Sequence, residues 1–257
     1  MLSNAQKRQF AEDGYLKIPG VIPQVMVEQA RRAINHSVGH VGKGTDDPEA
    51  HRNGQLGDDI RNHPVISDLF NKTPIIRIAE SLMGEGNVLP IGGAQIALRY
   101  PSSPEGDVAE PRGHLDGLGT GTNGMPKGVY RRGFTAFGVI YLDDVLEPYS
   151  GNFTVWPKSH TCFEAYFKHE GHEILAEGMP RIDLPEPPVM VTGRAGDFIL
   201  AHHAMVHTGG PNASPDVRYA TIARLKHKDC DANGVGVYTD IWREWSGIVD
   251  VLSDALD

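Results

Sequence analysis

The sequence predicts a mainly β fold, a sandwich or jelly roll, with helices flanking it. Two observations lead to this prediction. After Gly84 the chain consists of short apolar runs separated by Gly and Pro, which is typical of many short strands joined by turns. Before Gly84, apolar residues recur at helical spacing. We expect strands at residues 88–91, 95–100, 134–142, 152–156, 189–191, 197–201 and 218–225.

The segment before Gly84 predicts three helices. Ser3 and Gln6 fit a capping box and Gly14 supplies a stop, so the first helix covers residues 4–13. A brief strand at residues 15–18 follows, and two further helices run over residues 23–39 and 73–84. These helices would buttress one sheet and leave the other face of the roll as a cavity.

The chain of 257 residues suits one domain, and its 40% hydrophobic content can fill a core. Within this domain we expect a mainly helical buttress at residues 1–84, a jelly-roll core at residues 85–226 and a C-terminal tail at residues 227–257.

Composition excludes several classes of function. The net charge of −9 and the pI near 5.7 argue against nucleic-acid binding, which needs a basic face. Cys162 and Cys230 are too few for a disulfide scaffold or a thiolate zinc site. The N-terminus lacks an apolar signal core, and no stretch approaches the roughly 20 apolar residues of a spanning helix. We therefore expect a soluble, cytoplasmic protein without nucleic-acid or membrane partners.

The segment from Gly113 to Gly117 contains a candidate metal motif. On an extended segment the side chains of His114 and Asp116 leave the same face. His207, arriving from a distant strand, would complete two imidazoles and one carboxylate on one face of a metal, the facial triad of non-haem Fe(II) oxygenases. Alone, the triplet is weak evidence, because an Asp between glycines is more often a turn residue.

The third ligand and its surroundings leave alternatives open. Periodicity also allows His203, which shares a face with His207 on a regular strand. Residues 208–217 are rich in Gly and Pro and predict a hairpin, which would place Arg218 about one rung from His207 on the neighbouring strand. A guanidinium there suits a carboxylate ligand, although a strand arginine more often forms a surface ion pair.

Three elements together resemble the phytanoyl-CoA dioxygenase family. They are the triplet His114-Leu115-Asp116, the turn from Gly151-Asn152 to Ser159-His160, and His207 followed by Arg218. Their order and spacing agree with the family pattern, and the opening from Phe10 to Tyr15 is also similar. The resemblance extends to about Leu225 and is loosest over residues 42–62 and after His227.

This resemblance implies a double-stranded β-helix of the cupin-like kind that uses Fe(II), the cosubstrate 2-oxoglutarate and O2. It implies that His114, Asp116 and His207 hold the iron and that Arg218 binds the cosubstrate. Gln95 and Thr135 lie on strands that would enter the barrel near the metal. Each could bind 2-oxoglutarate or substrate, or be an interior polar group satisfied by a neighbour.

The sequence therefore predicts a 2-oxoglutarate-dependent dioxygenase that hydroxylates an unactivated C–H bond of a small organic molecule, with succinate and CO2 as coproducts. Desaturation, epoxidation or cyclisation with the same cofactors is the alternative within the class. A non-catalytic jelly-roll binding protein is the alternative outside it. A zinc hydrolase is less favoured because of Arg218 and because no clear general-base Glu lies near the triad.

Several residues around the triad have two interpretations. The long stretches 101–113 and 117–133 can cover an active site. Within the second, Lys127, Arg131 and Arg132 can attract an anion or be solvated charges. We interpret Asn152 as a turn former, Ser159-His160 as structural, and Trp242 with Trp245 as either a cover over a ligand or a helix face packed on the barrel.

Overall fold

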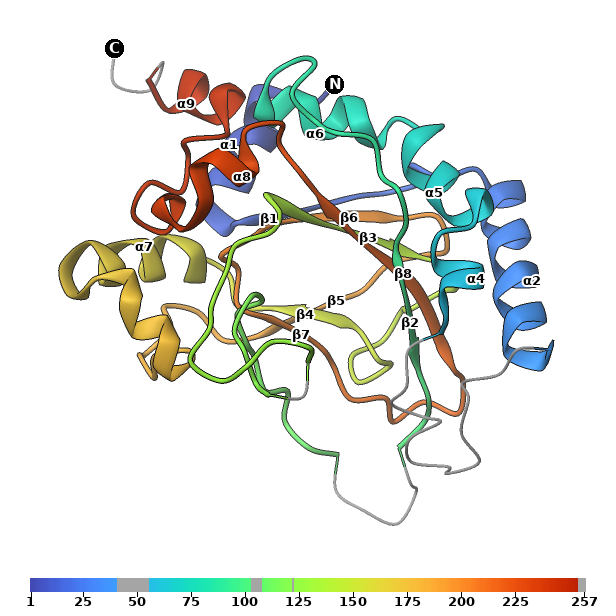
Figure 1. The fold of residues 1–257 in the computed structure, drawn as a ribbon. Helices are drawn as coiled ribbons and strands as arrows, with labels where there is room; N and C mark the ends of the chain where they lie inside the picture. The colour runs from blue at the N-terminus through green and yellow to red at the C-terminus, as the bar shows by residue number, and fades with distance from the viewer. Residues whose placement is uncertain (41–55, 103–107, 122, 254–257) are drawn as a thin grey trace.

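Two antiparallel sheets face each other, and helices cover the outer face of the larger one (Figure 1). This arrangement comes from a computed structural model that describes residues 1–40, 56–102, 108–121 and 123–253. The larger sheet has the strand order β1-β6-β3-β8-β2 and the smaller one the order β5-β4-β7. The two sheets do not close into a continuous barrel, because no strand belongs to both in the described part of the chain.

The strands are β1 (Tyr15–Ile18), β2 (Gln95–Arg99), β3 (Ala136–Tyr141), β4 (Phe153–Val155), β5 (Val189–Val191), β6 (Phe198–His202), β7 (His207–Gly209) and β8 (Arg218–Leu225). The helices are α1 (Asn4–Asp13), α2 (Gln24–His40), α4 (Asp58–Arg61), α5 (Pro64–Asn71), α6 (Ile75–Met83), α7 (Ser159–Glu170), α8 (Cys230–Asn233) and α9 (Ser246–Ser253). Two 3-10 helices, η1 (His172–Glu177) and η2 (Gly234–Thr239), complete the set. No helix in these described residues is long and apolar enough to cross a membrane.

Most of the expected elements are found close to their expected bounds. Helix α1 has the capping box of Ser3 and Gln6 and ends at Gly14, whose φ of 77° is left-handed. The expected strand at residues 88–91 is wrong, because only Val88 forms an isolated bridge, to His227. The sequence does not predict helix α7. Its N-cap residue, Lys158, has no capping side-chain bond, so no capping motif marks the start of this helix.

The larger sheet is buried on both faces, and alternate residues separate the two interiors. In β3, Ala136 and Ile140 join the cluster formed with the helices, whereas Phe137, Val139 and Tyr141 join the cluster between the sheets. Strands β6 and β8 alternate in the same way. In β2, Ile96 and Leu98 join the cluster with the helices, while Gln95, Ala97 and Arg99 line a cavity between the sheets. The residues of β2 and β8 that do not face the helices therefore face the space between the sheets.

Strands β7 and β8 lie in different sheets, which corrects the hairpin expected at residues 208–217. Strand β7 pairs with β4, and His207 bridges to His114, whereas β8 pairs with β2 and β3. The Gly- and Pro-rich segment turns the chain as expected, but the turn leads from the smaller sheet to the larger one and does not join two neighbouring strands. Arg218 consequently faces His207 across the interior and not along a shared ladder.

The two C-terminal tryptophans pack on the protein interior. Trp245 is fully buried and its ring lies 5.0 Å from that of Phe10 and 5.1 Å from that of His202. Trp242 contacts the same Phe10 ring at 6.4 Å. The packing expected of this segment is thus confirmed, but the expected helix face is wrong, because residues 241–244 form a turn and α9 begins only at Ser246.

A buried ion pair anchors the C-terminal segment to the larger sheet. Arg132 and Glu244 are each 1% exposed and form two hydrogen bonds with each other. The hydroxyl of Thr135 donates to Glu244 at 2.6 Å and accepts from Arg132 and from the backbone N–H of His227, both at 3.0 Å. Asn233 also donates to Glu244, at 2.9 Å. Removing one charge would leave the other buried without its counter-charge.

Replacement of Glu244 by alanine should therefore lower the free energy of unfolding by about 3–5 kcal/mol, because Arg132 would keep its charge in a dry site. Asp240→Ala is the matched control in the same segment, since it breaks an Arg243 pair whose side chains are 46% and 50% exposed and costs under about 1 kcal/mol. Urea denaturation of both variants measures the difference. Equal losses would show that the Arg132–Glu244 pair does not anchor the segment.

Candidate active site

His114 and Asp116 project into the space between the sheets from one side of an extended segment. The residue between them, Leu115, is 3% exposed and packs in the separate cluster with Phe163 and Phe167. This alternation places the imidazole and the carboxylate on the same side. The backbone of His114 exchanges hydrogen bonds with that of His207 at 3.0 and 3.1 Å, which brings the third side chain alongside.

The three side chains converge on one point. The Nε2 atoms of His114 and His207 lie 3.3 and 3.8 Å from Oδ1 of Asp116, and the candidate ligand atoms are all within 4.8 Å of one another. Ligands bound at about 2.1 Å and at right angles around a metal lie about 3 Å apart. Small side-chain adjustments therefore fit a metal ion, and the donor set of two imidazoles and one carboxylate suits non-haem iron.

His207 is prepared as a neutral ligand. Its Nδ1 donates to the backbone carbonyl of Met205 at 3.0 Å, which leaves the Nε2 lone pair directed at Asp116. Burial lowers the pKa of His207 to about 4, despite the nearby charge of Asp116. The ring also packs at 4.2 Å from that of Phe137. The position, tautomer and charge of this side chain all favour metal binding at neutral pH.

Asp116 is held as a carboxylate. Burial alone would raise its pKa, but the hydrogen bond with His114 and the interactions with His207 and Arg224 hold the pKa of Asp116 well below its usual value. Its second oxygen, Oδ2, accepts a hydrogen bond of 2.7 Å from Nη2 of Arg224. One carboxylate oxygen thus faces the histidines while the other is fixed by a guanidinium.

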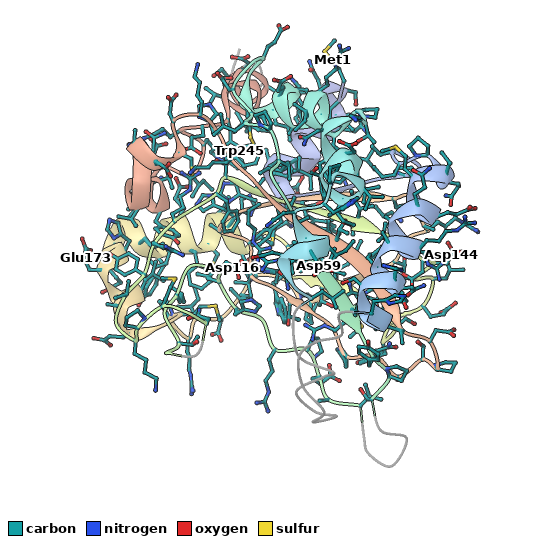
Figure 2. The ribbon with its side chains drawn as sticks, turned by 45° about the vertical axis from the view of Figure 1, so that its right-hand side comes forward. Met1, Asp59, Asp116, Asp144, Glu173 and Trp245 are labelled. Atoms are coloured by element: carbon teal, nitrogen blue, oxygen red, sulfur yellow. The ribbon has the colours of Figure 1, made fainter. Side chains whose placement is uncertain are left out.

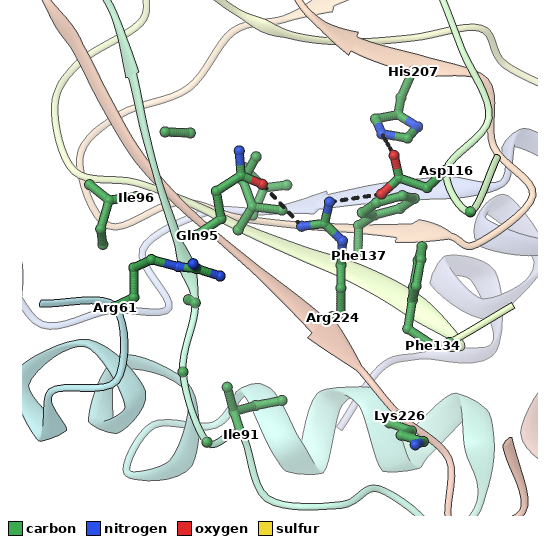
Figure 3. A pocket seen from close by; sticks show the side chains of 18 of the residues that line it. Arg61, Ile91, Gln95, Ile96, Asp116, Phe134, Phe137, His207, Arg224 and Lys226 are labelled. Atoms are coloured by element: carbon green, nitrogen blue, oxygen red, sulfur yellow. Dashed lines mark hydrogen bonds and ion pairs between the residues drawn. The ribbon is translucent and has the colours of Figure 1, made fainter. Parts of the chain in front are cut away.

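Arg224 is a site residue that the sequence interpretation missed. It lies six residues after Arg218 on the same face of β8, and its other nitrogen, Nη1, donates to Oε1 of Gln95 at 3.3 Å (Figure 3). Its guanidinium carbon lies 5.6 and 5.1 Å from the ring centres of Phe134 and Phe137. The only sequence signal was the alternation along β8, which gives no distance to Asp116.

A cavity of about 1200 Å³ contains the triad and extends along the inner face of β2 and β8. Figure 3 shows Asp116, His207, Arg224 and Gln95 converging within it, and Figure 2 shows Asp116 well inside the outline of the molecule. Its lining is rich in positive charge for so acidic a protein. It includes Arg61, Arg99, Arg131, Arg132, Arg218, Arg224 and Lys226, against the acidic residues Asp116 and Asp231. Such a lining favours an anionic ligand.

Arg218 lines this cavity at the start of β8. It is only 4% exposed, and it donates from Nε to the carbonyl of Gly151 at 2.6 Å and from Nη1 to that of Ala97 at 2.9 Å. Burial, together with the positive charge of Arg99, lowers the pKa of Arg218 to about 10. The alternative of a surface ion pair is wrong, because the side chain is buried and its bonds are to carbonyls.

Of the other candidates, Gln95 lines the cavity, whereas His202, His203 and Thr135 do not. His202 and His203 are buried, with their ring centres 4.3 Å apart and their planes tilted by 41°, and neither belongs to the metal-ligand group. Thr135 is fully buried in the network around Glu244 and does not line the cavity, so a role for it in binding cosubstrate is not supported. Gln95 lines the cavity, as expected.

The remaining candidates are structural or solvated. The side chain of Asn152 donates to the carbonyl of Glu147 within the turn, as expected of a turn former, and also to the carbonyl of Val191 on β5. Ser159 and His160 are buried at the start of α7. Arg132 is neutralised by Glu244, Lys127 is exposed and does not line the cavity, and Arg131 does line it. The two segments expected to cover the site are residues 101–113 and 117–133, of which residues 103–107 and 122 lie outside the described part of the chain.

The sequence matches the phytanoyl-CoA dioxygenase (PhyH) family over residues 10–220. The match covers most of the chain, and the protein therefore belongs to this family of non-haem iron enzymes. As a member it uses iron, 2-oxoglutarate and O2. No curated protein sequence matches the chain.

Solved structures share the fold. HygX from Streptomyces hygroscopicus, with nickel and 2-oxoglutarate bound, is 18% identical and superposes with a TM-score of 0.55 over 88% of this chain and 87% of its own. AviO1 from Streptomyces viridochromogenes Tue57 is 18% identical, with a TM-score of 0.56 over 88% and 96%. The α-ketoglutarate-dependent carbocyclase SnoK from nogalamycin biosynthesis is 22% identical, with a TM-score of 0.51 over 87% and 83%. These similarities establish the architecture, not the substrate.

The ligand assignment predicts the effects of two histidine substitutions. Loss of a residue that hydrogen-bonds to a metal ligand typically weakens metal binding roughly 10–100-fold. His207→Ala removes a ligand itself, so it should weaken Fe(II) binding by more than this. His203→Ala, which changes a neighbouring histidine outside the ligand group, should leave the affinity unchanged. Anaerobic calorimetric titration with Fe(II) measures the affinity of each variant. The opposite pattern would make His203 the ligand.

Arg224 should support metal binding by fixing Asp116. Arg224→Leu should lower the Fe(II) affinity roughly 10–100-fold, because the carboxylate loses its charge-assisted hydrogen bond. Removing a positive charge favours the metal, but Arg224 is 36% exposed and its field is screened, so positioning dominates. Lys226→Met removes a charge from the same lining without touching Asp116 and serves as the control. Tighter Fe(II) binding by Arg224→Leu would contradict this role.

Proposed function

We propose that the protein is a dioxygenase that hydroxylates an unactivated C–H bond of a small organic molecule, with succinate and CO2 as coproducts. The proposal rests mainly on one observation. Two imidazoles and one carboxylate meet at one point of an interior cavity that Arg218 also lines. The same cavity has space for a substrate beside the cosubstrate, since its volume of about 1200 Å³ exceeds the usual range for a single small-molecule site.

In this proposal His114, Asp116 and His207 hold Fe(II), and Arg218 binds the distal carboxylate of 2-oxoglutarate. When bound, the iron and the keto acid supply the activation of O2 that is coupled to oxidative decarboxylation. The facial arrangement leaves the opposite positions of the metal open to ligands. Arg218 suits its part because the two carbonyls of Gly151 and Ala97 fix the guanidinium in advance.

The remaining lining supports orientation of the substrate. The rings of Phe134 and Phe137 form an apolar wall next to the triad, and Arg224 and Gln95 lie beside it with polar atoms. Apolar walls with a few convergent polar groups are typical of sites for small organic ligands. The cavity also excludes bulk water from the buried side of the metal, where His207 is only 6% exposed.

A related outcome, such as desaturation or ring formation, would use the same residues. Among the proteins of similar fold are a carbocyclase and an epimerase, and the outcome depends on how the substrate is held relative to the metal. Product mass distinguishes the reactions, because hydroxylation adds one oxygen and desaturation or cyclisation removes two hydrogens. We favour hydroxylation as the simplest result for a site with a carboxylate ligand.

The role of Arg218 gives the central test of the proposal. Anaerobic addition of 2-oxoglutarate to the Fe(II) protein should produce the weak visible absorption band of the chelate, and O2 should then give iron-dependent succinate. Arg218→Ala should weaken 2-oxoglutarate binding by about 2–4 kcal/mol while keeping its iron, because a charge-assisted, desolvated contact is lost. His207→Ala is the control that should abolish succinate formation.

Two results would contradict the proposal. Unchanged 2-oxoglutarate affinity in Arg218→Ala would remove the arginine from the cosubstrate site. Failure of the wild-type protein to bind 2-oxoglutarate in the presence of Fe(II) would instead favour the non-catalytic binding protein.

A further inference from the structure

Two arginines face each other on neighbouring strands at one end of the cavity. In the antiparallel pairing of β2 with β8, Arg99 lies directly opposite Arg218. Side chains at directly opposite positions share one face of the sheet, and here that face looks into the space between the sheets. Like charges in this arrangement repel each other and destabilise the strand pair. The pairing therefore needs a compensating negative charge.

Two glycines make room for this pair. A Cβ at Gly209 would lie 2.5 Å from Nε of Arg99, so the guanidinium rests directly against the backbone of β7, two residues beyond His207. A Cβ at Gly151 would lie 2.9 Å from Cβ of Arg99 and 3.1 Å from Cβ of Arg218. Any side chain at either position would displace the arginines. The guanidinium of Arg99 thus lies between the metal-ligand strand and Arg218.

Neither arginine forms a hydrogen bond or ion pair with a carboxylate of the described residues, and the half-buried Asp143 acts electrostatically on Arg218 but not on Arg99. Arg218 donates to two backbone carbonyls, and Arg99 forms no side-chain hydrogen bond or ion pair within that part of the chain. Arg99 is exposed to the cavity, whereas the guanidinium of Arg218 is buried beside it. By contrast, the cavity-lining residues Arg132, Arg224 and Lys226 each have an acidic partner. Of the lining arginines that have no acidic side-chain partner among the described residues, Arg99, Arg131 and Arg218, two lie directly opposite each other on neighbouring strands.

We propose that Arg99 is a second cosubstrate-binding residue, which joins Arg218 to hold the distal carboxylate of 2-oxoglutarate between two guanidinium groups. This inference rests on the proposed function and adds a residue to its site. A carboxylate has two oxygens with about four acceptor positions, which is enough for two arginines at once. Arg218 supplies a fixed donor, and Arg99 supplies a donor from the open side of the cavity, next to the strand that carries His207.

This arrangement makes the distal carboxylate important for affinity. A keto acid of the same chain length that ends in a methyl group, 2-oxopentanoate, keeps the end that chelates a metal but offers nothing to the two arginines. The difference in affinity between 2-oxoglutarate and 2-oxopentanoate therefore reports on the arginine pair. The affinity of the protein for the metal should not depend on the arginine pair.

Calorimetry on the Ni(II)-loaded protein, which binds keto acids without turnover, tests the proposal. Arg99→Gln should raise the Kd for 2-oxoglutarate about tenfold or more, because a charge-assisted contact is lost. The Kd for 2-oxopentanoate and the affinity for Ni(II) should not change. Arg131→Gln removes another arginine of the same cavity lining and is the matched control, with an unchanged Kd for 2-oxoglutarate.

A second variant tests the same contact without altering Arg99. Gly209→Ala should displace the guanidinium of Arg99 and raise the Kd for 2-oxoglutarate in the same direction, with thermal unfolding as the check that the variant is folded. If Arg99→Gln binds 2-oxoglutarate like the wild type while Arg218→Ala does not, the inference is wrong and the proposed function stands. If Arg99→Gln weakens both keto acids equally, Arg99 has only a structural role and the inference is also wrong. Failure of the wild-type protein to bind 2-oxoglutarate would refute the proposed function itself.

Discussion

The pairing of β2 with β8 is the constraint on which the site depends. Because this part of the sheet is buried between helices and a second sheet, alternate residues must serve two different interiors. One set, such as Ile96 and Leu98, packs with the helices. The other set supplies polar residues to the cavity, and the register places Arg99 opposite Arg218 and Gln95 beside Arg224. A shift of one residue would exchange these sets and bury unpaired charges against the helices.

Electrostatics in the cavity follow from this register. The carboxylate of Asp116 is the negative centre, and it is surrounded by imidazoles on one side and by Arg224 on the other. The protein carries a net charge of −9, yet its cavity lining is mainly basic. Such a cavity attracts an anion although the molecule as a whole would repel it. The charge of the whole chain therefore says little about the charge of its ligand.

The two sheets contribute differently to the site. The smaller sheet supplies His207, and the backbone of His114 is hydrogen-bonded to its edge at that residue. The larger sheet supplies Arg99, Arg218 and Arg224. The site is formed where these two sheets face each other, and glycines at positions 151 and 209 permit their close approach. The buried network around Glu244 fixes the C-terminal segment next to the same sheet, and its Arg132 borders the cavity.

The sequence by itself determined what depends on short-range pattern. Helix α1, strands β1, β5 and β8 and the shared face of His114 and Asp116 follow from periodicity, caps and alternation within a few residues. Only the tertiary structure shows which distant residues meet. It places His207, and not His203, with His114 and Asp116, and it buries Thr135 with Glu244. It also places β7 and β8 in different sheets, Arg99 opposite Arg218, and Arg224 beside Asp116. Each of these depends on which distant segment lies opposite. Arg224 meets an aspartate 108 positions away, and such a contact is fixed by the register and packing of whole sheets, which no local pattern encodes.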